Sequence, residues 1–428
     1  DIKNYIKEIG ESDCIIIYAI SYMSHHEINN IIRIIKSTYP KKKIAILENS
    51  QSVTAYSVQR VCDSFFEHGA DLVIVGEPYF NWDEIKNFLI EEKVNKPINV
   101  LTFKSSTECT RIIKKISKYP IPAWNLINLK NYWSLPYSHG PKTKKYLPVL
   151  TSRGCPYPCD FCVVPETNNR RWRGNLPEDV VNEIAYLKEN YNVSDFQIED
   201  LNPTVDHKRW EAICKILIKK NLNIKFYFVS GTKAETVHLD SIPLFAKAGC
   251  KYISISPESG SDKVMKKIGK NFNYEHGLKL IKLCLINNIK TQACFIIGHP
   301  SETENDFIQS NAYLAKLIRA GLDETAIFIV SPFAGSKIYK DNLIEIEDKE
   351  LIISFSPEGR KNYKELSRRR GIMIFTFLRL KITRHFFIFL VQCYRALIGT
   401  PKTKIENLPR RIIYIYILVI FNKLKSVW

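Results

Sequence analysis

The sequence lacks a hydrophobic run suited to crossing a membrane. The segment 372–398 has the length of a spanning helix, but five charged or histidine residues interrupt it. The uninterrupted run 412–421 has only ten residues, whereas a spanning helix needs roughly 20. No secretory signal is visible at the N-terminus, where the chain begins with Asp1. No internal repeat and no recognisable nucleic-acid-binding module are found. These absences predict a cytoplasmic protein without a nucleic-acid partner.

The sequence also lacks the cysteine pattern of a disulfide framework. Of its 11 cysteines, all but Cys155, Cys159 and Cys162 are scattered singly among apolar residues, as buried free thiols usually are. This usage favours a reducing, intracellular compartment.

Negative charge is scarce in the C-terminal region. The chain carries a net charge of +18, and residues 361–428 contribute +13 of it, because they hold 15 Lys and Arg but only Glu365 and Glu406 as acids. Two interpretations stay open. The region is either a helical cap with a solvated charged face, or a set of basic and apolar helices that contact an anionic membrane peripherally.

Residues 1–103 alternate between short apolar runs, rich in Ile and Val, and helical stretches such as 27–37 and 57–67. This alternation predicts a Rossmann-like, doubly wound parallel sheet, which binds ligands at the carboxyl ends of its strands. The prolines of 104–146 interrupt the pattern and predict a linker. The expected strands of the first unit are 14–19, 43–47, 71–75 and 98–101.

The alternation resumes at residue 147 and continues to 345. Six strand–helix units predict a partial (β/α)6 barrel of the TIM type, in which chemistry takes place at the C-terminal ends of the strands. The chain is therefore predicted to be an α/β protein, with 346–428 as a basic, largely helical C-terminal extension. The expected strands are 147–151, 195–199, 225–229, 252–257, 292–297 and 327–330.

Cys155, Cys159 and Cys162 form the pattern Cys-x3-Cys-x2-Cys directly after the first of these strands. Three thiolates on one short loop can hold three corners of an iron–sulfur cube and leave the fourth iron open. Zinc would need a fourth Cys or His, and the nearest histidine, His139, lies sixteen residues upstream. Zinc and plain structural cysteines remain the alternatives.

The cysteine loop and five further motifs resemble the radical S-adenosylmethionine (SAM) enzymes that carry a cobalamin-binding domain. The resemblance implies that the three cysteines hold a 4Fe–4S cluster whose open iron chelates SAM. Reduction of SAM then yields a 5′-deoxyadenosyl radical, with electrons from a donor such as flavodoxin or ferredoxin and a small molecule as substrate. The motifs are YPIPAW at 119–124, TSRG at 151–154, RRWR at 170–173, FIIGHP at 295–300 and SPFAGS at 331–336.

The resemblance also implies a set of SAM-binding residues at the ends of the barrel strands. Each has an ordinary structural alternative: a strand-end turn for the glycine motif, a solvated carboxylate at the barrel mouth, or a helix N-cap for the acidic pair at 199–200. The residues assigned to SAM are Phe161, Glu199 or Asp200, Ser256, Glu258, Gly298 and Pro300.

The N-terminal unit resembles cobalamin-binding domains less closely. Residues 70–78, ADLVIVGEP, match a late strand and turn of such domains, and 47–55 lie where a Gly-Gly pair commonly faces the corrin ring. Here Asn49 and Ser50 replace that pair, no Asp-x-His-x-x-Gly loop is present, and the match begins after the first strand–helix unit, as in an N-terminally truncated domain. The adjacent His25 and His26 are expected to be solvated.

The resemblance implies cobalamin-dependent methyl transfer to a carbon of a small metabolite. A radical cyclisation or rearrangement without cobalamin is the alternative if Asn49 and Ser50 mean that cobalamin is not bound. The alternative of another class is a non-catalytic metal-binding scaffold that docks a partner through its basic tail.

Overall fold

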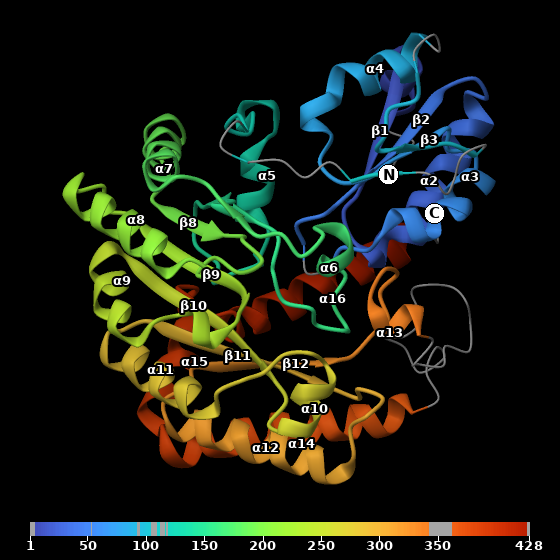
Figure 1. Ribbon diagram of the computed structural model, residues 1–428. Coiled ribbons are helices and arrows are strands. Elements are labelled where there is room, and N and C mark those ends of the chain that lie inside the picture. The colour runs from blue at the N-terminus through green and yellow to red at the C-terminus, as the bar shows by residue number, and fades with distance from the viewer. Residues whose placement is uncertain are drawn as a thin grey trace.

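A computed structural model describes residues 5–52, 54–91, 95–103, 109–111, 116, 119–341 and 362–425. The described residues build two larger sheets, each with helices packed against it (Figure 1), and a third sheet of two short strands. The first sheet lies at the upper right of Figure 1, and the second fills the lower left.

The first sheet has the strand order β1-β2-β3-β4. Alternate residues of its strands face opposite sides, so Ile44, Ile46 and Val73 pack against α2 and α3, whereas Ala45 and Ile74 pack against α4. Helices therefore cover both faces. The elements are α1 (Ile6–Glu11), β1 (Cys14–Ala19), α2 (His25–Thr38), β2 (Lys43–Glu48), α3 (Cys62–Glu67), β3 (Leu72–Ile74), α4 (Trp82–Glu91) and β4 (Val100–Leu101).

The expectation of an entirely parallel, doubly wound sheet is wrong in two respects. The strands β1, β2 and β3 are parallel, but β4 pairs antiparallel with β3. The strand order also follows the chain without reversal in the described residues. A short apolar run does not encode its own direction, which is why the run 98–101 gave no sign of the antiparallel pairing.

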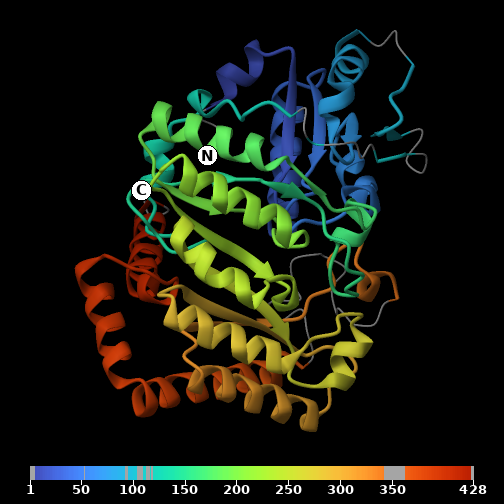
Figure 2. The same ribbon diagram turned by 60° about the vertical axis from the view of Figure 1, so that its left-hand side comes forward.

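The second sheet has six strands in the order β5-β8-β9-β10-β11-β12, and every neighbouring pair is parallel. All six lie within a few residues of the expected strands. Helices α7, α8, α9, α11 and α12 cover its outer face (Figure 2). The strands are β5 (Leu147–Val149), β8 (Asp195–Ile198), β9 (Lys225–Thr232), β10 (Cys250–Glu258), β11 (Lys290–Ile297) and β12 (Glu324–Ile329).

Shorter elements at the carboxyl ends of these strands carry the loops discussed below. They include a two-stranded antiparallel sheet of β6 and β7. The helices of this unit and the short elements are α5 (Leu129–Ser134), β6 (Ser152–Arg153), α6 (Val164–Thr167), β7 (Arg173–Gly174), α7 (Pro177–Tyr191), α8 (His207–Lys219), α9 (Ile242–Ala248), α10 (Asp262–Lys267), α11 (Tyr274–Ile286), α12 (Glu304–Arg319) and α13 (Lys337–Lys340).

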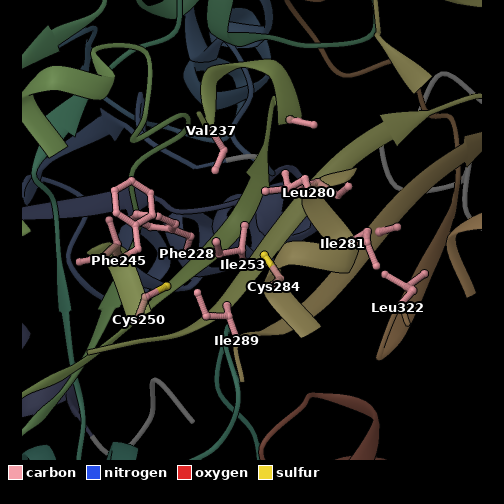
Figure 3. Close-up of a cluster of buried hydrophobic side chains, with 14 of the residues drawn as sticks. Phe228, Val237, Phe245, Cys250, Ile253, Leu280, Ile281, Cys284, Ile289 and Leu322 are labelled. Atoms are coloured by element: carbon pink, nitrogen blue, oxygen red, sulfur yellow. The ribbon is translucent and has the colours of Figure 1, made fainter. Parts of the chain in front are cut away.

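The main core lies between the second sheet and its outer helices. Figure 3 shows Phe228 and Ile253 of the sheet packed with Phe245 of α9 and with Leu280 and Cys284 of α11. Local sequence explains the helices: α7 begins at Pro177, where a missing N–H costs nothing, and buries one stripe of side chains at helical spacing. Burial of this core fixes the sheet that positions the strand-end loops.

Three helices, α14 (Tyr363–Arg384), α15 (Phe386–Ile398) and α16 (Leu408–Lys425), follow the second sheet. The helix α14 packs on α12 through its buried stripe, which includes Met373 and Phe377. A short 3₁₀ helix, Ile405–Asn407, joins α15 to α16. No helix within the described ranges has both the length and the hydropathy of a membrane span.

Candidate active site

The cysteine loop leaves the second sheet after β5 through Gly154. This residue has φ +78°, and a Cβ there would lie 2.0 Å from the carbonyl oxygen of Arg171. Only glycine fits such a close backbone approach at positive φ. The loop therefore departs at the carboxyl end of β5, where the barrel prediction placed it.

The three cysteines of the loop are half-buried, and their thiols are close enough to affect one another's pKa. Burial raises the pKa of Cys159 to about 12, with Lys270 opposing the rise, and burial together with the neighbouring Cys159 raises the pKa of Cys162 further. Such thiols need a cation to become thiolates. Within the described ranges no three His, Cys, Asp or Glu side chains form a group that could hold a single metal ion. Three soft donors on one loop fit a 4Fe–4S cube, which takes each thiolate on a different iron.

Asp160, inside the loop, fixes its position through three contacts. Its N–H donates to the carbonyl oxygen of Ile268 at 3.0 Å, and its own carbonyl accepts from the N–H of Ile338 at 3.1 Å. Its carboxylate oxygen Oδ2 lies 2.9 Å from Nε2 of His299, while Oδ1 is buried and has no hydrogen-bond partner. The loop is thus tied to the motif that follows β11. Sequence reasoning missed this pair, although His299 stands inside the FIIGHP motif.

Glu258 ends β10 in a conformation that few side chains adopt. Its φ is +58°, and the strand carries a register shift between Ile255 and Glu258. Its Oε1 accepts from Nζ of Lys270 at 2.6 Å, and the same amine donates to Oγ of Ser256 at 2.8 Å. Burial alone would lower the pKa of Lys270, but Glu258 together with Cys159 and Cys155 outweighs burial and raises it. A buried ion pair therefore lies beside the cysteine loop, and Lys270 is a member that the sequence did not reveal.

The acidic pair at 199–200 separates into two different roles. The carboxylate of Asp200 is fully buried and accepts from the N–H and the Oγ1 of Thr151, both at 2.6 Å, and from Oγ of Ser152. Asp200 thus fixes the segment that precedes the cysteine loop. Glu199 remains partly exposed, with Oε2 at 2.6 Å from Nδ1 of His139.

The remaining predicted residues lie at different depths. Phe161 packs against the main core, and Gly298 is buried with φ +81°. The N–H of Gly298 donates to Oε2 of Glu302 at 2.7 Å, which in turn lies 3.4 Å from Nη1 of Arg369 in α14. Pro300 is exposed. The structure thus gathers the cysteines, Ser256 and Glu258 around Lys270, and it directs the side chain of Asp200 elsewhere.

A cavity of about 610 Å³ opens at the carboxyl ends of β1, β2 and β3. It has the volume of an ordinary ligand pocket. Aromatic rings and a few polar groups line it, as is usual for cofactor sites. Its walls include Tyr18, Ser50, Gly76, Tyr79, Tyr119 and Arg153.

Gln51 joins the wall of this cavity to the start of the cysteine loop, and Glu77 joins the wall to β7. Gln51 accepts from the N–H of Gly154 at 3.1 Å and donates to Oδ1 of Asn168 at 2.9 Å. The carboxylate of Glu77 accepts two hydrogen bonds from Arg173, one from Nη1 at 2.7 Å and one from Nη2 at 2.8 Å. The cavity and the loop are therefore neighbours held by direct hydrogen bonds.

The comparisons with known proteins agree with this arrangement. Residues 149–314 match the sequence model of the Radical SAM superfamily. The chain is 24% identical over 63% of its length to an uncharacterized methyltransferase of Pyrococcus horikoshii, of which it covers 57%. It is 26% identical over 53% of its length to an anaerobic magnesium-protoporphyrin IX monomethyl ester cyclase of Synechocystis, of which it covers 44%. The chain thus spans about half the length of these curated relatives.

Among solved structures, the fold is similar to that of the radical SAM methyltransferase TsrM from Kitasatospora setae, a structure with cobalamin and a 4Fe–4S cluster bound. The TM-score is 0.61 at 14% identity, with 79% of this chain and 69% of the other covered. At this identity the likeness concerns the fold alone. The two findings agree: residues 149–314 are similar to the radical SAM superfamily, and the fold around them is similar to that of a radical SAM methyltransferase.

Proposed function

We propose that this protein is a cobalamin-dependent radical SAM methyltransferase that acts on a carbon of a small molecule. The observation that carries the proposal is the cavity at the carboxyl ends of β1–β3, which adjoins the start of the cysteine loop through Gln51. A relative named as a methyltransferase and a fold neighbour solved with cobalamin support it. In this proposal 1–103 form the cobalamin domain, 104–146 the linker, 147–345 a partial (β/α)6 barrel and 346–428 the extension.

Cys155, Cys159 and Cys162 hold the cluster in this proposal. When bound, the cluster and SAM together supply a 5′-deoxyadenosyl radical. The chain's own contribution is to fix the loop through Asp160. Electrons come from a small redox protein such as flavodoxin or ferredoxin.

SAM binds along the carboxyl edge of the second sheet in this proposal. Glu258 faces its polar groups, and Lys270 and Ser256 hold that carboxylate in place. Gly298 and Pro300 supply a flat backbone surface for the adenine. Of the acidic pair, Glu199 is assigned to SAM, because the carboxylate of Asp200 is taken up by Thr151 and Ser152. Phe161 supports the loop from the core side.

Asn49 and Ser50 stand where glycines are common, but the two side chains do not fill the cavity. The side chain of Asn49 turns into the fold, where its Nδ2 donates to the carbonyl oxygen of Ile20 at 2.7 Å and its Oδ1 accepts from the N–H of Gln51 at 3.0 Å. Only Ser50 of the pair lines the cavity. The replacement therefore leaves the space open, and cobalamin is assigned to it.

The test is an anaerobic reconstitution of the chain with iron, sulfide and cobalamin, followed by SAM and a strong reductant. S-adenosylhomocysteine that forms only with cobalamin present supports methyl transfer. A Ser50→Phe variant, which fills the cavity, is expected to lose this product and to keep cobalamin-independent SAM cleavage. Ser37→Phe, at an exposed position of α2, is the matched control.

A radical cyclisation without cobalamin is the second candidate, favoured by the relative named as a cyclase. In the same assay it predicts 5′-deoxyadenosine without S-adenosylhomocysteine, whether or not cobalamin is added. A metal-binding scaffold predicts neither product and no SAM binding.

A further inference from the structure

The outward face of α15 is apolar, in contrast to the usual surface helix. Phe387 and Leu397 are each 81% exposed, and Tyr394 is 61% exposed. Together with Leu390, Val391 and Ile398 they follow helical spacing and form one stripe, which we call the outer stripe of α15. In Figure 2 this helix lies at the left margin of the molecule, with no other element outside it.

The protein-facing side of α15 carries polar contacts beside the half-buried Ile388, Phe389 and Ala396. Gln392 is buried, and its Nε2 donates to the carbonyl oxygen of Asp323 at 3.3 Å. His385, just ahead of the helix, lies 2.8 Å from the carbonyl oxygen of Ile318. These hydrogen bonds lie on the inner side of the helix, and the outer stripe points away from the fold. A solvated charged cap does not describe it.

The helix α16 repeats this exposure. Its residues Ile412, Ile413 and Tyr416 are 57%, 59% and 68% exposed, and Ile415 and Ile417 are also exposed. A helix that is apolar around its circumference belongs in a core or in lipid. Contiguous apolar surface of this kind marks an interaction site on a soluble protein.

The charge around the outer stripe is positive. Arg379 and Arg384 are exposed before α15, and Lys402, Arg410 and Arg411 are exposed after it. The two acids of this region are already engaged: Glu365 lies 2.6 Å from Arg369, and Glu406 is buried at 3.5 Å from Arg395. The face therefore combines apolar side chains with an excess of positive charge.

We propose that the outer stripe of α15, with α16, docks the enzyme on an anionic membrane surface. Basic side chains around an apolar helix are suited to lipid headgroups and the acyl chains beneath them. A second copy would bring its own positive charge against this face, and a nucleic acid would leave the apolar stripe in water. The 13 residues of α15 measure about 20 Å, so it lies within the interface rather than across a core of about 30 Å. The proposal does not depend on the chemistry of the cysteine loop.

The experiment is co-sedimentation of the full chain with vesicles of phosphatidylcholine alone or with about a third phosphatidylserine. We expect binding to the anionic vesicles, weakened by salt, and about tenfold weaker binding of the double variant Phe387→Ser with Leu397→Ser. The matched control is Leu126→Ser with Ile286→Ser, two residues that are 80% and 75% exposed on other elements. The control is expected to bind like the wild type. Arg379→Glu with Arg384→Glu is expected to weaken binding and to reduce its salt dependence.

Three results would overturn the proposal. The first is no sedimentation with either vesicle by a folded protein. The second is equal binding to neutral and anionic vesicles, which would show that the basic side chains do not contribute to binding. The third is a concentration-dependent dimer in analytical ultracentrifugation that the Phe387→Ser with Leu397→Ser variant abolishes in the absence of lipid, which would make a second copy the occupant. Circular dichroism melting of each variant separates loss of binding from loss of fold.

Discussion

The two ends of the second sheet hold similar buried residues in different circumstances. At the carboxyl end, Glu258 pairs with Lys270 beside the cysteine loop. At the amino end, Glu324 accepts from Tyr252 and from the N–H of Ile405, at 2.7 Å in the second case. Both carboxylates are buried inside the same sheet.

The difference lies in what each carboxylate faces. The amino end is closed by the chain itself, because the segment between α15 and α16 inserts Lys404, whose Nζ donates to Oε1 of Gln292 at 3.2 Å. The carboxyl end faces a loop of three thiols and a neighbouring cavity. A buried carboxylate is therefore no sign of function by itself. Its surroundings distinguish a structural group from one that serves a ligand.

The largest expected effect comes from removing one cysteine of the loop at the carboxyl end of the second sheet. Cys159→Ala should retain no cluster after reconstitution, because the cube loses one of its three protein ligands. Iron content and visible absorption measure the loss. Cys393→Ser, at an exposed position of α15, should bind iron like the wild type. Equal iron in both variants would contradict the assignment of the loop.

The second effect tests the junction between the first sheet and β7. Glu77→Ala takes the carboxylate partner from Arg173, and breaking such a buried pair typically costs about 3–5 kcal/mol. Thermal and urea unfolding measure the change. Glu67→Ala, an exposed carboxylate on α3, should stay within about 0.5 kcal/mol of the wild type. Similar stability of the two variants would mean that the junction contributes little.

The third prediction compares the two buried carboxylates directly. Glu258→Gln should weaken SAM binding roughly tenfold or more, as expected when a charged hydrogen bond is lost. Glu324→Gln should leave SAM affinity unchanged and lower the free energy of unfolding by about 1–3 kcal/mol. Isothermal titration calorimetry and urea unfolding report the two quantities. If Glu324→Gln weakened SAM binding and Glu258→Gln lowered only the free energy of unfolding, the assignment of the SAM site to the carboxyl end would be wrong.

The sequence predicted the strands of the second sheet well, because each is a β-branched or aromatic run followed by a helix with an apolar stripe. It also located the cysteine loop and the polar residues at the strand ends. It did not predict Lys270 as the partner of Glu258, or His299 as the partner of Asp160, because such pairs join distant segments of the chain. Nor could it separate Glu199 from Asp200, since neighbouring residues diverge only once the backbone is placed.

The C-terminal region shows the same limit. Its charge and helices were evident from composition, but part of the predicted 346–428 extension, up to residue 361, lies outside the described residues. Which face of α15 turns outward follows from contacts with distant segments, such as the hydrogen bond of Gln392 to Asp323. His25, expected to be solvated, is buried and lies 3.2 Å from the hydroxyl of Tyr56, because α2 packs on the first sheet from its first turn.

The smallest effect concerns His25, the buried first residue of α2, which packs on the first sheet. Burial, and then His68 and His26, lower the pKa of His25 from 6.5 to about 4. The folded state therefore favours the neutral ring of His25. Its contribution to the free energy of unfolding is fully present above pH 6.5 and is lost as the pH falls toward 4. The slope is at most about 1.4 kcal/mol per pH unit.

Urea unfolding between pH 7 and pH 4 measures this dependence, and His25→Asn should flatten it without changing turnover per folded molecule. An unchanged slope in the variant would assign the acid sensitivity to other groups.

The central claim is that the carboxyl end of the second sheet cleaves SAM by radical chemistry. The most direct test is anaerobic turnover of the reconstituted chain with SAM and a strong reductant, with 5′-deoxyadenosine quantified. The account predicts 5′-deoxyadenosine from the wild type and from Glu324→Gln, and none from Cys159→Ala. Cluster-loaded wild-type protein that binds SAM but releases no 5′-deoxyadenosine, with or without candidate substrates, would contradict it.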